Sequence, residues 1–390
     1  MISVIKDIKV YAPEYLGIRD IVIAGGKIEG IYENIDISDT FIKINVINGK
    51  NKIIFPGFID SHVHLIGGGG EGGYRTRTPE LQLSNLTSSG ITTVVGCIGT
   101  DSECRSIKSL IAKVKSLKEE GISAYCYTGS YAIPVKTLTD VIERDLMLIE
   151  EIIGVGEIAL SDNRSSEPSY EEFVKLVAQS RVGGILSGKS GVVNVHIGQG
   201  KRKLDYLFKL IKESDIPVSQ LLPTHINRNI NLFIEGLNYV KEGGFIDLTT
   251  SSDVNFLEDG ELTASQGLKK YIESGLPIKN ITFSSDGNGS MPKFNENKEM
   301  IGLGICSVES LYTQVKESIK KYNTPIETAI KVITSNVADI LKLYNKGRIL
   351  AGKDADLVIV DEDSLDIDIV ISNGIKMVED GECIIRGTFE

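Results

Sequence analysis

Between residues 53 and 345 the chain alternates apolar strand-like runs with amphipathic helix-like stretches. Eight strand-like runs occur, in the order IIFPGFIDSHVHL, ITTVVGCIG, ISAYCYTGS, IIGVGEIAL, GVVNVHIG, PVSQLLPTHI, GFIDLTTS and ITFSSDG. Strands that alternate with helices form parallel sheets, and eight such units predict an α/β fold of the (β/α)8 TIM-like barrel type. A doubly wound open sheet is the alternative, but polar residues recur at too many strand ends for one switch point.

The two ends of the chain differ from this middle part. Residues 1–52 and 346–390 read as short strands separated by turns that contain glycine and asparagine, without a helical period. We therefore predict a small β-sandwich domain formed from both chain termini. Residues 53–345 are predicted to form the catalytic barrel.

Charge and composition exclude several classes of partner. The net charge of −11 argues against nucleic acid, because phosphate binding needs a basic face. No run of about 18 apolar residues occurs, so no membrane partner is expected. The five cysteines are an odd number, form no CxxC pair and lie mostly in apolar runs, which indicates small buried side chains. We expect a soluble protein that works in the cytoplasm.

The first strand of the predicted barrel carries a candidate metal site. His62 and His64 stand two residues apart, so a strand places both side chains on one face. Two imidazoles placed in this way can hold one divalent cation. An HxH pair alone is a weak signal, but its position at the end of a first barrel strand strengthens it.

Other potential ligands also come at strand ends. Glu157 ends the fourth strand, His196 the fifth, His225 the sixth and Asp286 the eighth. Active sites of this fold gather at the carboxyl ends of the strands. The chain has only four histidines, so none is left over, and we predict that all four bind metal. A buried structural or surface histidine is the alternative at each position.

Longer motifs resemble a known family. PGFIDSHVHL resembles the first-strand signature of the amidohydrolase superfamily, and GKDADLVIVD resembles the return to its small β domain. HVHLIGGGGEGGYRTRTPE, RVGGILSGKSGVV, LLPTHINRN and SSDGNGS are similar to the isoaspartyl dipeptidase family within it. These motifs span residues 56–360, and the tail IIRGTFE agrees with them.

The resemblance implies a metal-dependent dipeptidase that hydrolyses the β-aspartyl bond of isoAsp-Xaa dipeptides by attack of a metal-bridging hydroxide. Two divalent ions, expected to be Zn²⁺, would be held by His62, His64 and Asp286 on one side and by His196 and His225 on the other. Asp286 would also carry the proton from the attacking hydroxide to the leaving amine. A pair of metals lowers the pKa of a bound water and polarises the scissile carbonyl.

One position departs from the family pattern. Many relatives bridge the two metals with a carboxylated lysine on the fourth strand, but no lysine occurs between Lys136 and Lys175. Glu157 occupies the matching position and supplies a carboxylate without CO₂. A glutamate is shorter than a lysine carbamate, so a single-metal site with Glu157 as a nearby acid is the alternative.

Substrate recognition can be argued from charge. A β-aspartyl dipeptide has one free amine and two free carboxylates, which call for an acid and about two arginines. The sequence offers Glu71 in GGGGEGG, Arg164 in SDNRSS and Arg228 in HINRN. By resemblance, Glu71 binds the amine and the two arginines hold carboxylates. The resemblance adds an oxyanion role for Tyr131 and completes the pocket with Thr100, Ser290 and the backbone of Gly69 and Gly70. The sequence assigns no role to Arg75 or Arg77.

Two other functions remain open at this stage. Another amidohydrolase, such as an N-acyl-amino-acid deacylase or a dihydroorotase-like cyclic amidase, is one alternative, although its substrate would leave Glu71 without an amine. A non-catalytic scaffold on the same barrel is the other, although the ligand set is nearly complete. The family analogy also implies a homo-oligomer, whereas the sequence carries no interface signal.

Overall fold

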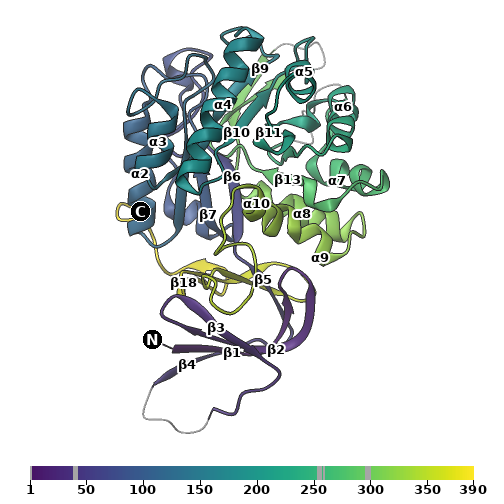
Figure 1. Cartoon of the computed structure of the whole chain (residues 1–390). Coiled ribbons are helices and arrows are strands. Elements are labelled where there is room, and N and C mark those ends of the chain that lie inside the picture. Colours follow the sequence, from purple (N-terminus) through teal and green to yellow (C-terminus); the bar gives the residue numbers. More distant parts are fainter. Residues whose placement is uncertain (1, 38–42, 253–256, 258–259, 295–299) are drawn as a thin grey trace.

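The computed structural model describes residues 2–37, 43–252, 257, 260–294 and 300–390. Strands from the first part of the chain and from its end share one sheet, drawn in purple and yellow at the bottom of Figure 1. Its N-terminal strands are β1 (Ile2–Tyr11), β2 (Tyr15–Ala24), β3 (Lys27–Tyr32), β4 (Ile44–Asn48) and β5 (Lys52–Pro56). Its C-terminal strands are β16 (Leu357–Asp361), β17 (Ile367–Ser372), β18 (Ile375–Glu379) and β19 (Glu382–Cys383).

The strand order β19-β18-β17-β16-β5-β1-β2-β3, with β4 also on β1, joins the two ends of the chain where β16 pairs with β5. Both strands are short apolar runs, and Ile54 and Ile359 pair across the ladder, fully buried. The termini thus form one β module, as the sequence indicated. The two-layer sandwich and the domain boundaries stay predictions, and β5 crosses the predicted boundary at residue 52.

All eight strands expected in the middle of the chain are present. They are β6 (Phe58–Val63), β7 (Ile91–Gly96), β8 (Ser123–Thr128), β9 (Ile152–Leu160), β10 (Val192–Ile197), β11 (Leu221–Thr224), β12 (Ile246–Thr249) and β13 (Ile281–Ser284). The first six form a parallel sheet in chain order, and β12 and β13 form a parallel pair. A parallel bridge between Val63 and Gly287 links the end of β6 to the segment after β13. The parallel sheet is curled; closure of all eight strands into one barrel stays a prediction.

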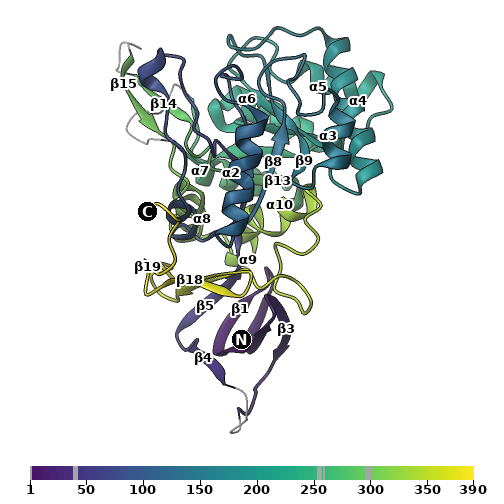
Figure 2. The ribbon, with the colours of Figure 1, turned by 90° about the vertical axis from the view of Figure 1, so that its left-hand side faces the viewer.

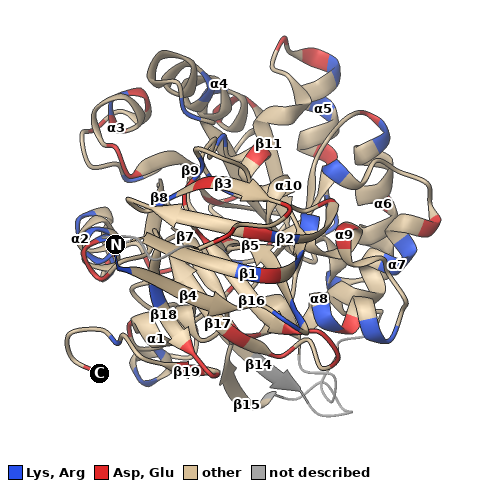
Figure 3. Ribbon diagram, turned by 90° about the horizontal axis from the view of Figure 1, so that it is seen from below, with Lys and Arg blue, Asp and Glu red and all other residues tan. Residues whose placement is uncertain are grey.

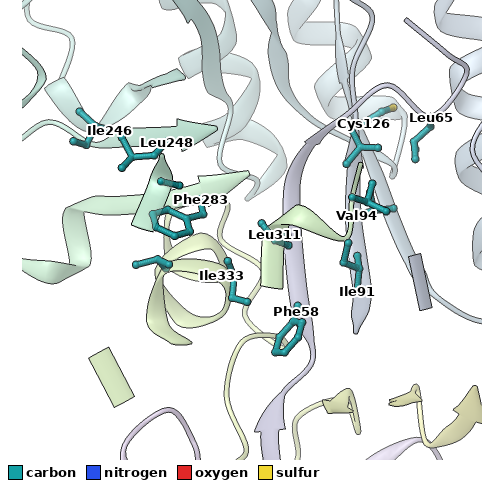
Figure 4. Close-up of a cluster of buried hydrophobic side chains, with 14 of the residues drawn as sticks. Phe58, Leu65, Ile91, Val94, Cys126, Ile246, Leu248, Phe283, Leu311 and Ile333 are labelled. Carbon is teal, nitrogen blue, oxygen red and sulfur yellow. The ribbon is translucent and has the colours of Figure 1, made fainter. Parts of the chain in front are cut away.

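Helices follow the strands and cover their outer face (Figure 1). They are α1 (Leu83–Thr87), α2 (Ile107–Glu119), α3 (Ile142–Leu148), α4 (Tyr170–Ser187), α5 (Asp205–Glu213), α6 (Ile230–Lys241), α7 (Ala264–Glu273), α8 (Ser310–Lys320), α9 (Ile326–Ala329) and α10 (Ser335–Ile340). The core between strands and helices includes Phe58, Val94, Phe283 and Leu311 (Figure 4). Burying such side chains is the main favourable contribution to folding.

Two further features bear on the site. A hairpin of β14 (Ser290–Phe294) and β15 (Met300–Ile305), not foreseen from the sequence, projects beside the parallel strands (Figure 2). Lys and Glu both occur on α6, α7 and α8 (Figure 3), as expected for a mixed-charge surface. No helix in the described part of the chain has both the length and the apolar character needed to cross a membrane.

Candidate metal centre and active site

The four histidines meet around one carboxylate. One oxygen of Glu157, Oε2, lies 3.0 Å from His196 Nδ1, 3.3 Å from His62 Nε2 and 3.7 Å from His225 Nε2. The other oxygen, Oε1, lies 3.4 Å from His64 Nε2. Every one of these side chains is buried. The structure therefore brings together the histidines that the sequence placed on three separate runs, with the glutamate between the two pairs.

Glu157 reaches this position from inside a strand. The sequence placed it at the end of the fourth strand, but β9 continues for three residues beyond it, to Leu160. The residue before it, Gly156, has φ of 155°, and a Cβ there would lie 2.8 Å from Asn194 Cβ on the neighbouring strand β10. Only glycine allows so close an approach of β9 to β10. The close approach brings Glu157 beside His196, which β10 carries.

Asp286 lies on the other side of His64 Nε2. Its Oδ1 is 3.1 Å from His64 Nε2 and 3.6 Å from His62 Nε2. Burial raises the pKa of Asp286, but the hydrogen bond with His64 and the charges of the neighbouring histidines outweigh burial and hold this pKa below its usual value. The carboxyl group is thus ionised at neutral pH and can accept a proton.

Two of the ligand candidates have an unusual backbone. His225, directly after β11, has φ of 65°, and Asp286, shortly after β13, has φ of 54°. Residues other than glycine rarely adopt this left-handed region, and those that do cluster at functional sites. At both positions the sharp turn at the end of the strand points the side chain to the histidine cluster.

The cluster fits a cation. Both ring nitrogens of His62 and the Nε2 atom of His225 are buried without a hydrogen-bond partner among the described residues. A buried polar atom left unpaired costs roughly 1–3 kcal/mol, which a bound metal would offset. The potential ligand atoms form two groups, and within each group all the atoms lie within 4.8 Å of one another. One group comes from His62, His64, Cys97 and Glu157, and the other from Glu157, His196 and His225. Glu157 belongs to both groups, as a bridging ligand must.

Hydrogen bonds from outside the cluster orient two of the histidines. Thr249 Oγ1 lies 2.6 Å from His225 Nδ1, so the opposite nitrogen faces Glu157. Asp162 Oδ2 lies 3.0 Å from His196 Nε2, so the other ring nitrogen, Nδ1, is the one that faces the metal centre. Neither residue could be foreseen from the sequence, because neither forms a pattern along the chain with its histidine. Such partners fix the tautomer and the orientation of a metal ligand.

Replacement of Asp162 tests this role. Arg164 donates to both oxygens of Asp162, at 2.9 Å and 2.8 Å, and together with His196 it lowers the pKa of Asp162 although burial raises it. We expect Asp162→Asn to weaken metal binding roughly 10- to 100-fold, the usual effect of losing such a partner. Metal affinity measured by competition with a chromophoric chelator checks this. Unchanged affinity would show that His196 is held by other contacts.

The remaining predicted residues surround a cavity of about 450 Å³. Its lining includes Gly69, Glu71, Thr100, Tyr131, Arg164, Arg228 and Ser290 beside His64, His196 and Asp286. Gly70 is the exception, since it lines the adjoining hollow with Tyr74 and Arg77. The predicted substrate residues other than Gly70 thus line one cavity at this edge of the strands, and their roles stay predictions.

Glu71 lines the same cavity as the metal ligands His64, His196 and Asp286. Thr100 Oγ1 donates to Glu71 Oε1 at 2.9 Å, and Ser290 Oγ donates to Glu71 Oε2 at 3.3 Å. The guanidinium of Arg164 approaches the same carboxylate at 3.5 Å. Thr100 and Ser290 thus hold the acid, and about a third of its side chain stays exposed to receive a positive group.

A buried arginine that the sequence did not reveal shapes the glycine loop. Arg105 donates to the backbone oxygens of Ile66 and Gly68, at 3.2 Å and 2.8 Å. It also makes an ion pair of 3.4 Å with Asp101, which pairs in turn with Arg77. This arginine holds the loop that carries Glu71. Arg77 thus has a structural role through its ion pair with Asp101. Arg75 is exposed.

Tyr131 and Arg228 complete the lining of the cavity. The hydroxyl of Tyr131 lies 2.9 Å from His196 Nδ1, and burial together with the charge of Glu157 raises its pKa well above the usual value. The phenol therefore keeps its proton and can donate a hydrogen bond. The side chain of Arg228 has no hydrogen-bond or ion-pair partner among the residues that the structure describes, so its guanidinium is free for an anion.

Comparisons with known proteins agree with this site. The profile of the amidohydrolase family matches residues 53–383. A β-aspartyl dipeptidase from Fervidobacterium islandicum AW-1, solved in complex with β-Asp-Leu, is 45% identical, with a TM-score of 0.92 over 98% of this chain and 97% of that one. A second structure of that enzyme is 43% identical, with a TM-score of 0.90 and 98% of each chain covered. The dihydroorotase of Aquifex aeolicus is 26% identical over 88% of this chain and 85% of its own length.

Proposed function

The chain belongs to the amidohydrolase family and, within it, to the β-aspartyl dipeptidases, and from this premise we propose that it hydrolyses the β-aspartyl bond of isoaspartyl dipeptides with divalent metal ions. The observation that carries the proposal is one cavity lined by His64, His196 and Asp286 together with the carboxylate of Glu71 and the guanidinium groups of Arg164 and Arg228. An acid and two arginines beside the metal ligands match the charges of a β-aspartyl dipeptide.

The metal part of the proposal depends on Glu157. His62, His64 and Asp286 would hold one ion, and His196 and His225 the other, with Glu157 between them. Imidazole and carboxylate donors suit zinc, which we propose as the metal. When bound, a pair of such ions lowers the pKa of water and polarises a carbonyl group.

Other side chains bind the substrate and transfer the proton. The Glu71 carboxylate binds the free amine of the substrate, and Arg228, with Arg164 beside it, binds carboxylates. The Tyr131 hydroxyl donates to the scissile carbonyl oxygen as negative charge develops there. Asp286, ionised at neutral pH, takes a proton at its carboxylate and returns it to the leaving amine.

Substrate choice tests the proposal. We expect turnover of β-Asp-Leu, and much slower turnover of α-Asp-Leu, N-acetyl-leucine and dihydroorotate, because the last two offer no amine to Glu71. Release of leucine or ring opening can be followed by chromatography on the metal-loaded protein. Turnover of only the acylated or cyclic compounds would establish the deacylase or cyclic amidase alternative. A scaffold protein would bind no stoichiometric metal.

Arg228 gives a second prediction. Arg228→Ala removes charge-assisted hydrogen bonds of about 1.5–3 kcal/mol, so we expect kcat/KM for β-Asp-Leu to fall roughly 10- to 150-fold, mainly through KM. Arg75→Ala is the matched control, since Arg75 is exposed and does not line the cavity. Equal kinetics for the two variants would remove Arg228 from the binding of substrate.

A further inference from the structure

Cys97 lies within the metal centre. It follows β7 directly, is fully buried, and its Sγ is 3.8 Å from His64 Nδ1 and 3.7 Å from the backbone oxygen of Val63. A ligand atom of Cys97 lies within 4.8 Å of ligand atoms of His62, His64 and Glu157, all buried. Ligand atoms of a tetrahedral zinc site lie roughly 3.5–4 Å apart, because each is about 2.0–2.3 Å from the ion.

The surroundings of the sulfur call for a cation. Both ring nitrogens of His62 are buried without a hydrogen-bond partner in the described part of the chain. The Cys97 sulfur lies 3.8 Å from His64 Nδ1, whereas Asp286 Oδ1 and Glu157 Oε1 lie 3.1 Å and 3.4 Å from His64 Nε2. Cys97 would supply the fourth donor beside His62, His64 and Glu157, in place of Asp286.

We propose that Cys97 is a metal ligand, so that His62, His64, Glu157 and the Cys97 thiolate hold the first ion. The proposal depends on the proposed function, since it needs a metal in this centre. Binding replaces the thiol proton by the metal, and the proton leaves to solvent. The sulfur takes over a coordination position assigned to Asp286 and leaves that carboxylate freer to carry a proton. A set with sulfur also selects zinc over magnesium or manganese.

Gly99, two residues after Cys97, supports this geometry. A Cβ at Gly99 would lie 2.9 Å from His64 Cε1 and 3.4 Å from Glu157 Oε1. The segment after β7 thus passes against both partners of the proposed set, and any side chain at Gly99 would displace His64. Cys97 reaches the centre because this segment packs so closely.

Cobalt spectroscopy tests the proposal. Metal-free wild-type protein, titrated with Co²⁺, should develop the near-ultraviolet charge-transfer band of a thiolate ligand. Cys97→Ser should lose this band and bind one of its two ions more than roughly tenfold more weakly. Cys126→Ser is the matched control, because Cys126 is equally buried but packs in the hydrophobic core (Figure 4), and it should keep the band.

X-ray absorption of the zinc-loaded wild type gives a readout that needs no variant. We expect one sulfur neighbour at about 2.3 Å. Two bound metals with nitrogen and oxygen neighbours only, and no thiolate band, would overturn the proposal and leave the dipeptidase intact. Failure to bind any metal would instead defeat the proposed function itself.

Discussion

Glu157→Ala is expected to abolish dipeptidase activity and to release at least one of the two metal ions. Glu157 faces all four histidines, so its loss leaves the two pairs without a shared ligand. We expect kcat/KM for β-Asp-Leu to fall by at least about a thousandfold, equivalent to ~4 kcal/mol of transition-state stabilisation. Metal content by mass spectrometry and turnover of β-Asp-Leu are the two measurements.

A matched control exists just before the same strand. Glu151 is also buried, but it pairs with Lys115 and Lys118, away from the histidines. Glu151→Ala should lose thermal stability while keeping both metals. CO₂ depletion should leave assembly of the wild type unchanged, because β9 carries no lysine. A Glu157→Ala protein with two metals and normal turnover would disprove the bridging role.

Asp286→Asn is expected to lower kcat by roughly 10²- to 10⁴-fold, the contribution of a positioned proton carrier. The amide keeps the shape of the side chain but cannot accept the proton. The lowered pKa of Asp286 means that the wild-type side chain works as the carboxylate, so its own protonation should limit kcat only as pH falls below the usual range of an aspartate, about 4.

The control for Asp286 is Asp205→Asn, at the exposed start of α5, which should have wild-type kinetics. Metal content of the Asp286→Asn protein separates the two tasks of this residue. If both metals remain and kcat still falls, proton transfer is the lost function. Wild-type kcat in this variant would exclude Asp286 from the reaction.

The fold could be predicted from the sequence where the local pattern of apolar and polar residues determines the secondary structure. Each of the eight strands is a short apolar run bounded by glycine or polar turns, and such runs have few other stable states than a buried strand. The pairing of both termini in one sheet was visible for the same reason. The β14–β15 hairpin was missed, since MPKF and its partner lack a clear alternation of apolar and polar residues.

The site was predictable only where chemistry and strand position coincide. Histidines at strand ends can be recognised in the sequence as candidate ligands, because parallel strands bring their carboxyl ends together. Asp162 and Arg105 could not be found in this way. Each acts through a contact with a distant partner, His196 or the backbone near Gly68, which only the folded chain creates. Cys97 was correctly expected to be buried, but its sequence neighbours do not show that its sulfur faces a histidine.

Two metal ions, joined through Glu157, are expected to support β-aspartyl hydrolysis. Metal-free protein can be titrated with Zn²⁺, with bound zinc and β-Asp-Leu turnover measured at each step. Turnover should rise with bound metal and reach its plateau at two zinc ions per chain. Full turnover at one ion, or without metal, would contradict this expectation.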